Sequence, residues 1–389
     1  MTLPLLPALA ASLVLICGSA PAQTAPPSPA KVLRYAFPIA ETGFDPAQIS
    51  DLYSRTITAN IFESPLTYDY LARPARIKPQ TAQALPEISD DFKRFIFRIR
   101  PGIYFADDPV FKGVRRELVA ADYVYSIKRY YDPQYKSPSL YLFENAKLLG
   151  LSELRRKAIA DKTPFPYDTE VAGLRTLDRY SFEVVLAAPS PRLHYQFADP
   201  NVTGAVAREV VEAYPGRSME HPVGTGPFVL KQWQRSAKIV LERNPTFREQ
   251  RYDEQAAVGD EPRRAAGDGL AGRRLPMLDR VEVSIIEEQQ PRWLAFLNGQ
   301  HDMLERLPNE YASIAAPNNR LAPNLAKRGV QMGRVPLVDV TVAYFGMEHP
   351  WWAATRPRKW RCAAQSRWLT TSARRSRSCG AARPSRPRA

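Results

Sequence analysis

The chain has 389 residues, of which 44% are hydrophobic and 24% charged, and these proportions are those of a soluble globular protein. The formal net charge of +14 is unevenly spread, because residues 351–389 carry 11 Lys and Arg and no Asp or Glu. The three cysteines, at positions 17, 362 and 379, exclude a metal framework built from cysteine ligands.

Residues 1–22 are predicted to be a secretion signal. An apolar core runs from Leu5 to Ile16, and Ala20-Pro21-Ala22 has the small-x-small pattern of a cleavage site. No Lys or Arg precedes the apolar core, which leaves the true start codon open. A lipid anchor at Cys17 is not expected, because Ile16 stands where a small residue is needed. Residues 23–31 are interpreted as a proline-rich spacer.

Strands and helices are predicted to alternate along the rest of the chain. The helical segments are 51–69, in which Leu52, Ile57, Ile61 and Phe62 have helical spacing, 120–133, and 290–304 with a glycine-containing stop at Asn298-Gly299. Residues 251–276 lack periodicity and are predicted to form a long solvated loop. The mixture predicts an α/β or α+β fold with a mixed sheet. The predicted strands lie at 32–38, within 92–105 as a pair, within 169–191 as two strands, and at 238–245, 278–288 and 340–348.

Arrangements that would carry catalysis are absent from the sequence. It contains no GxSxG, HExxH, CxxC or P-loop pattern, and its four histidines are scattered singly. Adjacent acidic residues such as Asp107-Asp108 would face opposite ways in a strand, which does not favour a catalytic pair. A secreted hydrolase would need a nucleophile and a base, and neither is identified. We therefore expect no enzyme activity, no cofactor and no metal.

Three segments resemble a known family. The first comprises FIFRIRPGIYFADDPVFKG, from Phe95 to Gly113, and RRELVAADYVYSIKRYYDP, from Arg115 to Pro133. The second is HPVGTGPF, at 221–228, with the strand partner VLERNP at 240–245. The third is LPMLDRVEVSIIEEQQPRWLAFLNGQHDML, at 275–304. Together they are similar to the family 5 extracellular solute-binding proteins of ABC transporters, which include oligopeptide-, dipeptide- and nickel-binding proteins.

The resemblance implies a two-lobed periplasmic binding protein of type II, similar to cluster C. Residues 32–284 would form lobe one, with a subdomain insertion, and 285–350 the start of lobe two. The implied function is the periplasmic solute-binding component of an ABC importer. Two lobes would close about a hinge on a peptide-like or other small solute and deliver it to the permease in the inner membrane. We expect a monomer that binds no nucleic acid.

The resemblance also implies where ligand binds. In relatives the loop after the first strand touches ligand, and here that loop is 41–45, with Thr42, Gly43 and Phe44 as candidates. Tyr53 and Asn60 face the same region by helical spacing, although either could be core or surface. The alternative is a purely structural role for the loop, as a turn closed by an Asx-type bond at Asp45. The remaining ligand-binding candidates are Gly224, Thr225 and Gly226.

The GTGP turn at 224–227 has its own two interpretations. Glycine tolerates positive φ and close backbone approach, and proline fixes its own φ, so this segment can turn sharply and deliver Phe228 into a strand. The turn could line the ligand cleft, or it could be a tight turn into the strand that makes no ligand contact. The residues alone leave both open.

The tail at 351–389 has two interpretations. Four of the six tryptophans lie there beside its many arginines, so it could be a basic arm that binds nucleic acid or a membrane surface. The other is translation out of frame after Pro350. Shifted by one base, permitted codons allow VGGYTPEKVALRRAISLAYD, which resembles the family's next segment. On that hypothesis lobe two and the C-terminal return to lobe one are incomplete, and the product is truncated and impaired.

Overall fold

The computed structural model describes residues 30–334 and Val342. Packing divides the chain into two compact units, one ending at Glu310 and the other beginning at Tyr311. The predicted signal, most of the predicted strand 340–348 and the basic tail lie outside the described residues. The frameshift therefore stays a prediction, and so does the lobe boundary expected after residue 284.

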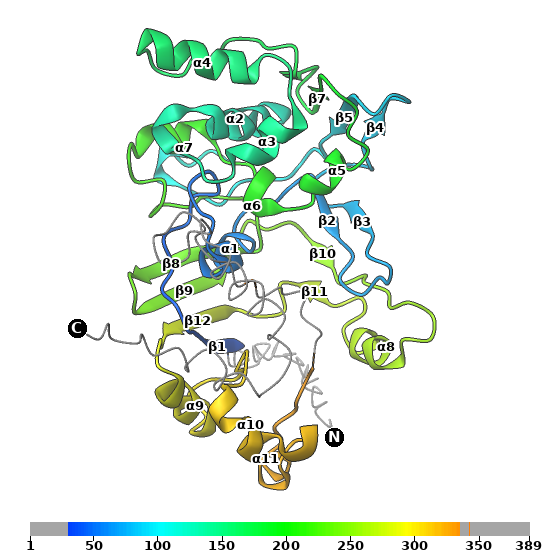
Figure 1. Cartoon of the computed structure of the whole chain (residues 1–389), viewed down its shortest axis with the longest axis vertical. Helices are drawn as coiled ribbons and strands as arrows, with labels where there is room; N and C mark the ends of the chain where they lie inside the picture. The colour runs from blue at the N-terminus through cyan, green and yellow to red at the C-terminus, as the bar shows by residue number, and fades with distance from the viewer. Residues whose placement is uncertain (1–29, 335–341, 343–389) are drawn as a thin grey trace, which may run out of the picture. The chain divides into compact units, whose positions relative to one another are not determined.

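The first sheet of the larger unit has four strands, in which β1 and β12 run parallel and the other neighbours are antiparallel. Val32 lies opposite Arg280, and Phe37 lies opposite Ile285. Because β1 and β12 are parallel, their carboxyl ends meet at one edge of the sheet, where the loop after β1 emerges. The order across the sheet is β1 (Val32–Phe37), β12 (Arg280–Ile285), β9 (Lys238–Arg243) and β8 (Phe228–Gln234) (Figure 1).

Helix α1 (Leu52–Thr58) packs against this sheet. Asp51 starts it as an N-cap, because its carboxylate accepts a hydrogen bond of 2.8 Å from the Ser54 amide. The buried face of the helix carries Tyr53 and Ile57, whereas Leu52 is 52% exposed despite its apolar character. The core between helix and sheet contains Phe37, Tyr53, Ile57, Ile61, Ile239, Leu241 and Val283.

A second antiparallel sheet of four strands packs against the long helix α2 (Ala120–Tyr131). Its inward side chains are aromatic, and Phe97 and Phe182 stack with their ring centroids 5.0 Å apart. Helix α2 begins where the Asp122 carboxylate accepts a hydrogen bond from the Val119 amide, and it ends before Pro133. The strand order is β4 (Glu87–Ile88), β5 (Arg94–Arg98), β7 (Ser181–Val185) and β6 (Leu174–Thr176).

Shorter elements complete the larger unit. β2 (Leu66–Tyr68) pairs with β3 (Ile77–Pro79), and β10 (Gln250–Arg251) pairs with β11 (Arg274–Leu275), both antiparallel. No helix within the described ranges is both long enough and apolar enough to cross a membrane. The remaining helices are α3 (Leu140–Ala146), α4 (Leu151–Asp161), α5 (Leu193–Gln196), α6 (Pro200–Thr203), α7 (Arg208–Ala213), α8 (Glu261–Asp268) and α9 (Gln289–Leu297).

The smaller unit, as far as it is described, is helical. Helix α10 (Asn309–Ala315) begins at the end of the larger unit and continues into the smaller one, which also contains α11 (Pro323–Lys327). Ala315, Ala322 and Leu325 are its buried apolar side chains among the described residues.

Two of the predicted segments are wrong. Residues 251–276 were expected to form one long loop, but they contain α8 and the strand β11, because the pairing of β11 with β10 returns the chain after the helix. Residues 92–105 were expected to form two strands and form only β5. The second half of that segment makes an isolated bridge between Tyr104 and Glu117. The predicted strands that became β1, β6, β7, β9 and β12 and the helices that became α2 and α9 are confirmed. The predicted helical segment 51–69 is confirmed only over α1, because its later residues Leu66–Tyr68 pair with β3 and form the strand β2.

Candidate functional site

The loop after β1 is held in place by the start of α1. The Thr42 amide donates a hydrogen bond of 2.9 Å to Ser54 Oγ, and the Thr42 hydroxyl donates to the Asp51 carboxylate that caps the helix. The Phe44 amide donates to the carbonyl oxygen of Met219. Gly43 has a φ of +152°, and a Cβ there would lie 2.5 Å from the Met219 side chain. The loop therefore has one defined conformation that requires glycine at this position.

Asp45 closes the far end of the loop. Its carboxylate accepts two hydrogen bonds from Arg129 on α2, at 2.9 and 2.6 Å, and a third from the Ala47 amide. Burial by itself would raise the pKa of the Asp45 carboxyl, but the charge and hydrogen bonds of Arg129 hold that pKa at about 2. The loop is thus closed by an Asx-type bond, as one sequence interpretation allows. The ion pair also joins the loop to helix α2.

Phe44 and Glu41 point away from solvent. The Phe44 side chain is 0% exposed, and its ring packs edge-on against Trp233 of β8 at 4.8 Å between centroids. The Glu41 carboxylate accepts hydrogen bonds from the Trp233 indole and from the Ser236 amide, while its second oxygen has no partner among the described residues. Thr42, by contrast, is exposed.

Tyr53 and Asn60 occupy different positions on or beside α1. Tyr53 is nearly buried, with its ring 4.8 Å from that of Phe37, and burial raises the pKa of its hydroxyl. Asn60 is half-buried just beyond the end of the helix, where its side-chain amide donates to the Thr56 carbonyl. Neither side chain lies in the loop's own hydrogen-bond network.

Gly224, Thr225 and Gly226 lie beside the opposite end of α1 from the loop. A Cβ on Gly224 or Gly226 would lie 2.1 or 2.6 Å from the Ile61 carbonyl oxygen, so the two glycines permit close backbone packing. Thr225 is 1% exposed and donates a hydrogen bond of 2.9 Å to Glu63, whose carboxylate also pairs with Arg248. These contacts support the interpretation of a tight turn into β8.

The structure therefore separates the candidates into two groups. Thr42 and Gly43 lie together at the start of α1, with Tyr53 on its first turn, whereas Asn60 and the residues at 224–226 lie at its other end. The ligand-binding roles of all eight candidates stay predictions.

The solvent side of the loop has features that the sequence did not single out. Ile39 is 60% exposed, close to the edge where β1 ends. Within the described part of the chain, the backbone N–H and C=O groups of Ile39, Ala40 and Glu41 have no hydrogen-bond partner in the backbone. The isolated exposure of an isoleucine has no sequence signal, because the apolar side chain looks like a continuation of the buried strand.

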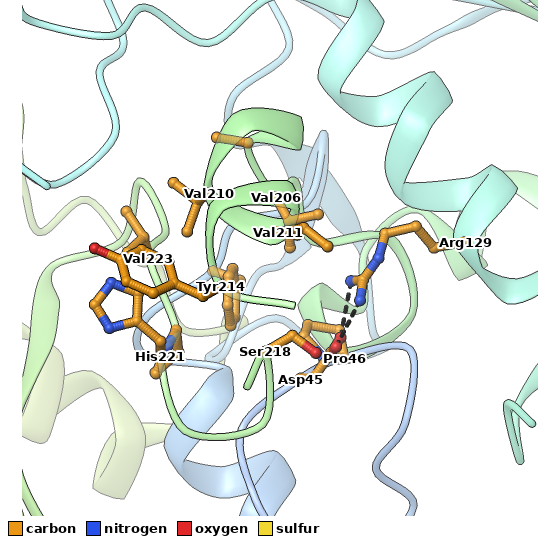
Figure 2. Close-up of a pocket in the computed structure, with 13 residues that line it drawn as sticks. Asp45, Pro46, Arg129, Val206, Val210, Val211, Tyr214, Ser218, His221 and Val223 are labelled. Atoms are coloured by element: carbon orange, nitrogen blue, oxygen red, sulfur yellow. Dashed lines mark hydrogen bonds and ion pairs between the residues drawn. The ribbon is translucent and has the colours of Figure 1, made fainter. Parts of the chain in front are cut away.

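A small hollow is lined in part by Asp45 and Pro46, at the end of the loop (Figure 2). It encloses about 320 Å³, including its open mouth, and valines on and around α7 line one side. The Asp45–Arg129 pair lies at one margin. His221 lies at another, with its Nε2 2.6 Å from the Asp108 carboxylate and its ring 4.0 Å from that of Tyr214. His221 thus fastens the segment before the GTGP turn, which agrees with a structural role for this lone histidine.

Metal chemistry finds no support in the described residues, where no group of three or more His, Cys, Asp or Glu side chains is placed to hold a metal ion.

Comparison with known proteins identifies the family. The sequence profile of the bacterial extracellular solute-binding proteins, family 5 (middle), matches residues 76–359, which is well over half of the chain. The chain belongs to this family. This match confirms the family assignment predicted from the three segments. Family 5 members are binding proteins of transport systems.

Two curated relatives are named as periplasmic binding proteins. It is 29% identical over 206 residues to the periplasmic oligopeptide-binding protein OppA of Salmonella typhimurium, covering 52% of this chain and 34% of that protein. It is 27% identical over 302 residues to the probable deoxycholate-binding periplasmic protein YgiS of Escherichia coli, covering 76% of this chain and 52% of that protein. The chain thus spans about a third to a half of the length of these relatives.

Solved structures confirm the fold of a periplasmic binding protein. Haemophilus influenzae OppA in complex with RPPGFSPFR matches with a TM-score of 0.57 at 19% identity, covering 75% of this chain and 49% of that one. The periplasmic binding protein DppA from Helicobacter pylori, in complex with the peptide STSA, matches with a TM-score of 0.54 at 23% identity, covering 75% and 49%.

Proposed function

We propose that this protein is the periplasmic solute-binding component of an ABC importer and that it captures peptide-like solutes at the loop 39–43. The captured solute is delivered to a permease in the inner membrane after closure about a hinge. The protein acts as a monomer, without catalysis, cofactor or nucleic acid. Its family and the names of its relatives support the transport role.

The unpaired backbone groups of the loop are the observation that carries the choice of ligand. Within the described ranges, the backbone donors and acceptors of Ile39, Ala40 and Glu41 have no backbone partners at the carboxyl ends of the parallel strands β1 and β12. Crevices outside the carboxyl ends of parallel strands are the usual ligand sites of open α/β sheets. An extended peptide satisfies such groups by strand-like pairing, whatever its side chains are.

The rigidity of the loop supports the same proposal. Thr42 is bonded to Ser54, Phe44 is buried against Trp233, and Asp45 is paired with Arg129. These anchors fix the backbone of the preceding residues before any ligand arrives, which lowers the entropy lost on binding. Ile39 supplies an exposed apolar surface beside the open backbone.

Binding of pooled di-, tri- and tetrapeptides to the full chain tests the proposal by isothermal titration calorimetry. We expect saturable binding that the Ile39→Asp variant weakens about tenfold or more, because the substitution removes apolar contact and adds charge beside the site. Ile159→Asp is the matched control, because Ile159 is 52% exposed on α4, far along the chain from the loop.

Two outcomes would overturn the proposal. If no peptide pool gives a saturable heat of binding with the full chain, the proposal that the ligand is a peptide is wrong. Equal weakening by Ile39→Asp and Ile159→Asp would remove the loop from the site, since only a general effect of the added charge would remain.

A further inference from the structure

Two adjoining hollows near β11 are lined by cations. Arg243, Arg274 and Pro276 line both of them, and Lys31 and Arg273 line one. The hollows have volumes of about 540 and 800 Å³, including their open mouths. Their other lining side chains are amide or apolar, with no carboxylate among them: Asn244, Pro245, Phe247, Leu275 and Met277.

Among the described residues, most of these cations have no carboxylate within ion-pair distance. Arg243 pairs with Asp279 at 2.9 Å. The side chains of Lys31, Arg273 and Arg274 have no carboxylate within ion-pair distance among the described residues. Both oxygens of Asp279 are already engaged, one by Arg243 and the other by the Lys31 amide. The hollows therefore hold a local excess of positive charge that the described protein does not neutralise.

The β10–β11 ladder concentrates this charge further. Arg251 lies directly opposite Arg274 in the two-residue pairing, and like charges opposite each other destabilise a strand pair. Arg251 is directed instead to Glu249 and to the Gly272 carbonyl. Arg274 is left facing the hollow. A sheet that places two arginines in register gains stability when an anion occupies the space beside them.

The backbone holds the cations in place. Lys31 precedes β1, and its carbonyl oxygen accepts hydrogen bonds from the Asp279 and Arg280 amides. The Arg273 carbonyl accepts from the Tyr252 amide, and Arg243 ends β9. These residues lie at the amino end of β1, roughly 20 Å of strand away from the loop 39–43 at its carboxyl end. The cation-lined hollows are therefore separate from the proposed peptide site.

We propose that the cation-lined hollows, formed by Lys31, Arg243, Arg273 and Arg274, bind a phosphate-bearing anion. Guanidinium groups match phosphate oxygens in bidentate geometry, and several cations that converge without carboxylate partners suit a doubly or more highly charged group. The buried Pro276 and the apolar Met277 provide an apolar floor for the organic part of such a ligand. The proposal does not rest on peptide capture.

Titration of the full chain with inorganic pyrophosphate at fixed ionic strength tests the proposal. We expect saturable binding, weakened about tenfold or more in the Arg273→Gln/Arg274→Gln double variant, since each charged hydrogen bond that is lost weakens affinity by about that factor. Both arginines are exposed, so the variant should fold, which circular dichroism checks. The control of equal net charge is Lys157→Gln/Arg192→Gln, whose residues are exposed and lie outside the hollows.

The result that overturns the proposal is either no saturable binding to the unchanged chain or equal weakening in both double variants. Equal weakening would mean general attraction to a basic protein. Sedimentation with phosphatidylglycerol vesicles, against phosphatidylcholine vesicles, separates the sources of the phosphate. Vesicle binding that needs Arg273 and Arg274 assigns the phosphate to a lipid headgroup, and pyrophosphate binding without it assigns a soluble ligand.

Discussion

Asp45 and Arg129 form a buried, two-pronged ion pair, with Oδ1 2.9 Å from Nη1 and Oδ2 2.6 Å from Nη2. Their side chains are 1% and 2% exposed. The pair joins the loop after β1 to helix α2, so two segments 84 residues apart are fastened where the loop must hold its shape. The loop's conformation thus depends on a buried pair of opposite charges.

Replacing Asp45 with asparagine should strongly destabilise the protein. The substitution leaves the Arg129 charge buried without its counter-ion, which costs about 3–5 kcal/mol in comparable pairs. Urea denaturation gives the change in the free energy of unfolding. Asp168→Asn is the matched control, because Asp168 pairs with Arg208 at the surface and should change stability little. A loss of stability in Asp45→Asn as small as that in Asp168→Asn would show that the buried pair is not needed.

Acid should weaken the stabilisation of the folded protein by Asp45. As the pH falls, the Asp45 carboxylate is protonated first in the unfolded chain, where its pKa is higher. The pKa of Asp45 is lowered from 3.8 to about 2 in the folded protein, so its stabilisation is complete above pH 4 and is lost as the pH falls through 2. The stability difference between the unchanged chain and Asp45→Asn should therefore narrow by about 2 kcal/mol between pH 5 and pH 2. A difference that stays constant over that range would contradict the assignment.

The GTGP turn should tolerate no side chain at its first glycine. Gly224→Ala places a methyl group 2.1 Å from the Ile61 carbonyl oxygen, and overpacking of this kind costs about 1–3 kcal/mol. Gly269→Ala is the control, because nothing lies within 4 Å of a Cβ there. Thermal denaturation should separate the two variants. An unchanged melting temperature for Gly224→Ala would mean that the close approach is not essential.

Thr225→Val distinguishes the two interpretations of the same turn. The substitution keeps the shape but removes the hydrogen bond to Glu63, and it should lower stability by about 1–3 kcal/mol. If the turn serves only to begin β8, peptide affinity measured at a temperature where the variant is folded should stay unchanged. Weaker peptide binding by the folded variant would favour the alternative in which 224–226 line the ligand site.

The sequence predicts the regular elements of this fold well where the pattern is strong. β1, β9, β12 and α2 follow from alternation, periodicity and the proline that ends the helix. The loop predicted for residues 251–276 is wrong because α8 has few apolar residues and β11 is a two-residue strand that exists only through its pairing with β10. Such elements depend on distant parts of the chain, which local pattern does not contain.

For the candidate loop, the sequence indicates that its backbone is shaped, but it does not indicate how the loop packs. Glycine and aspartate in ETGFDP indicate a shaped loop, and the structure has one. The burial of Phe44 against Trp233, almost 190 residues away, and the exposure of Ile39 could not be inferred, because both are set by tertiary packing. The cation-lined hollows also could not be predicted from the sequence, because their residues come from three separate segments.

Hydrogen–deuterium exchange at the loop tests the central claim most directly. The amides of Ile39, Ala40 and Glu41 have no backbone partners in the described structure, so they should exchange rapidly in the free protein. A peptide that pairs with the loop should slow their exchange, while the cation-lined hollows should be unaffected. Peptide binding that leaves exchange at 39–41 unchanged would contradict the account and place the ligand elsewhere.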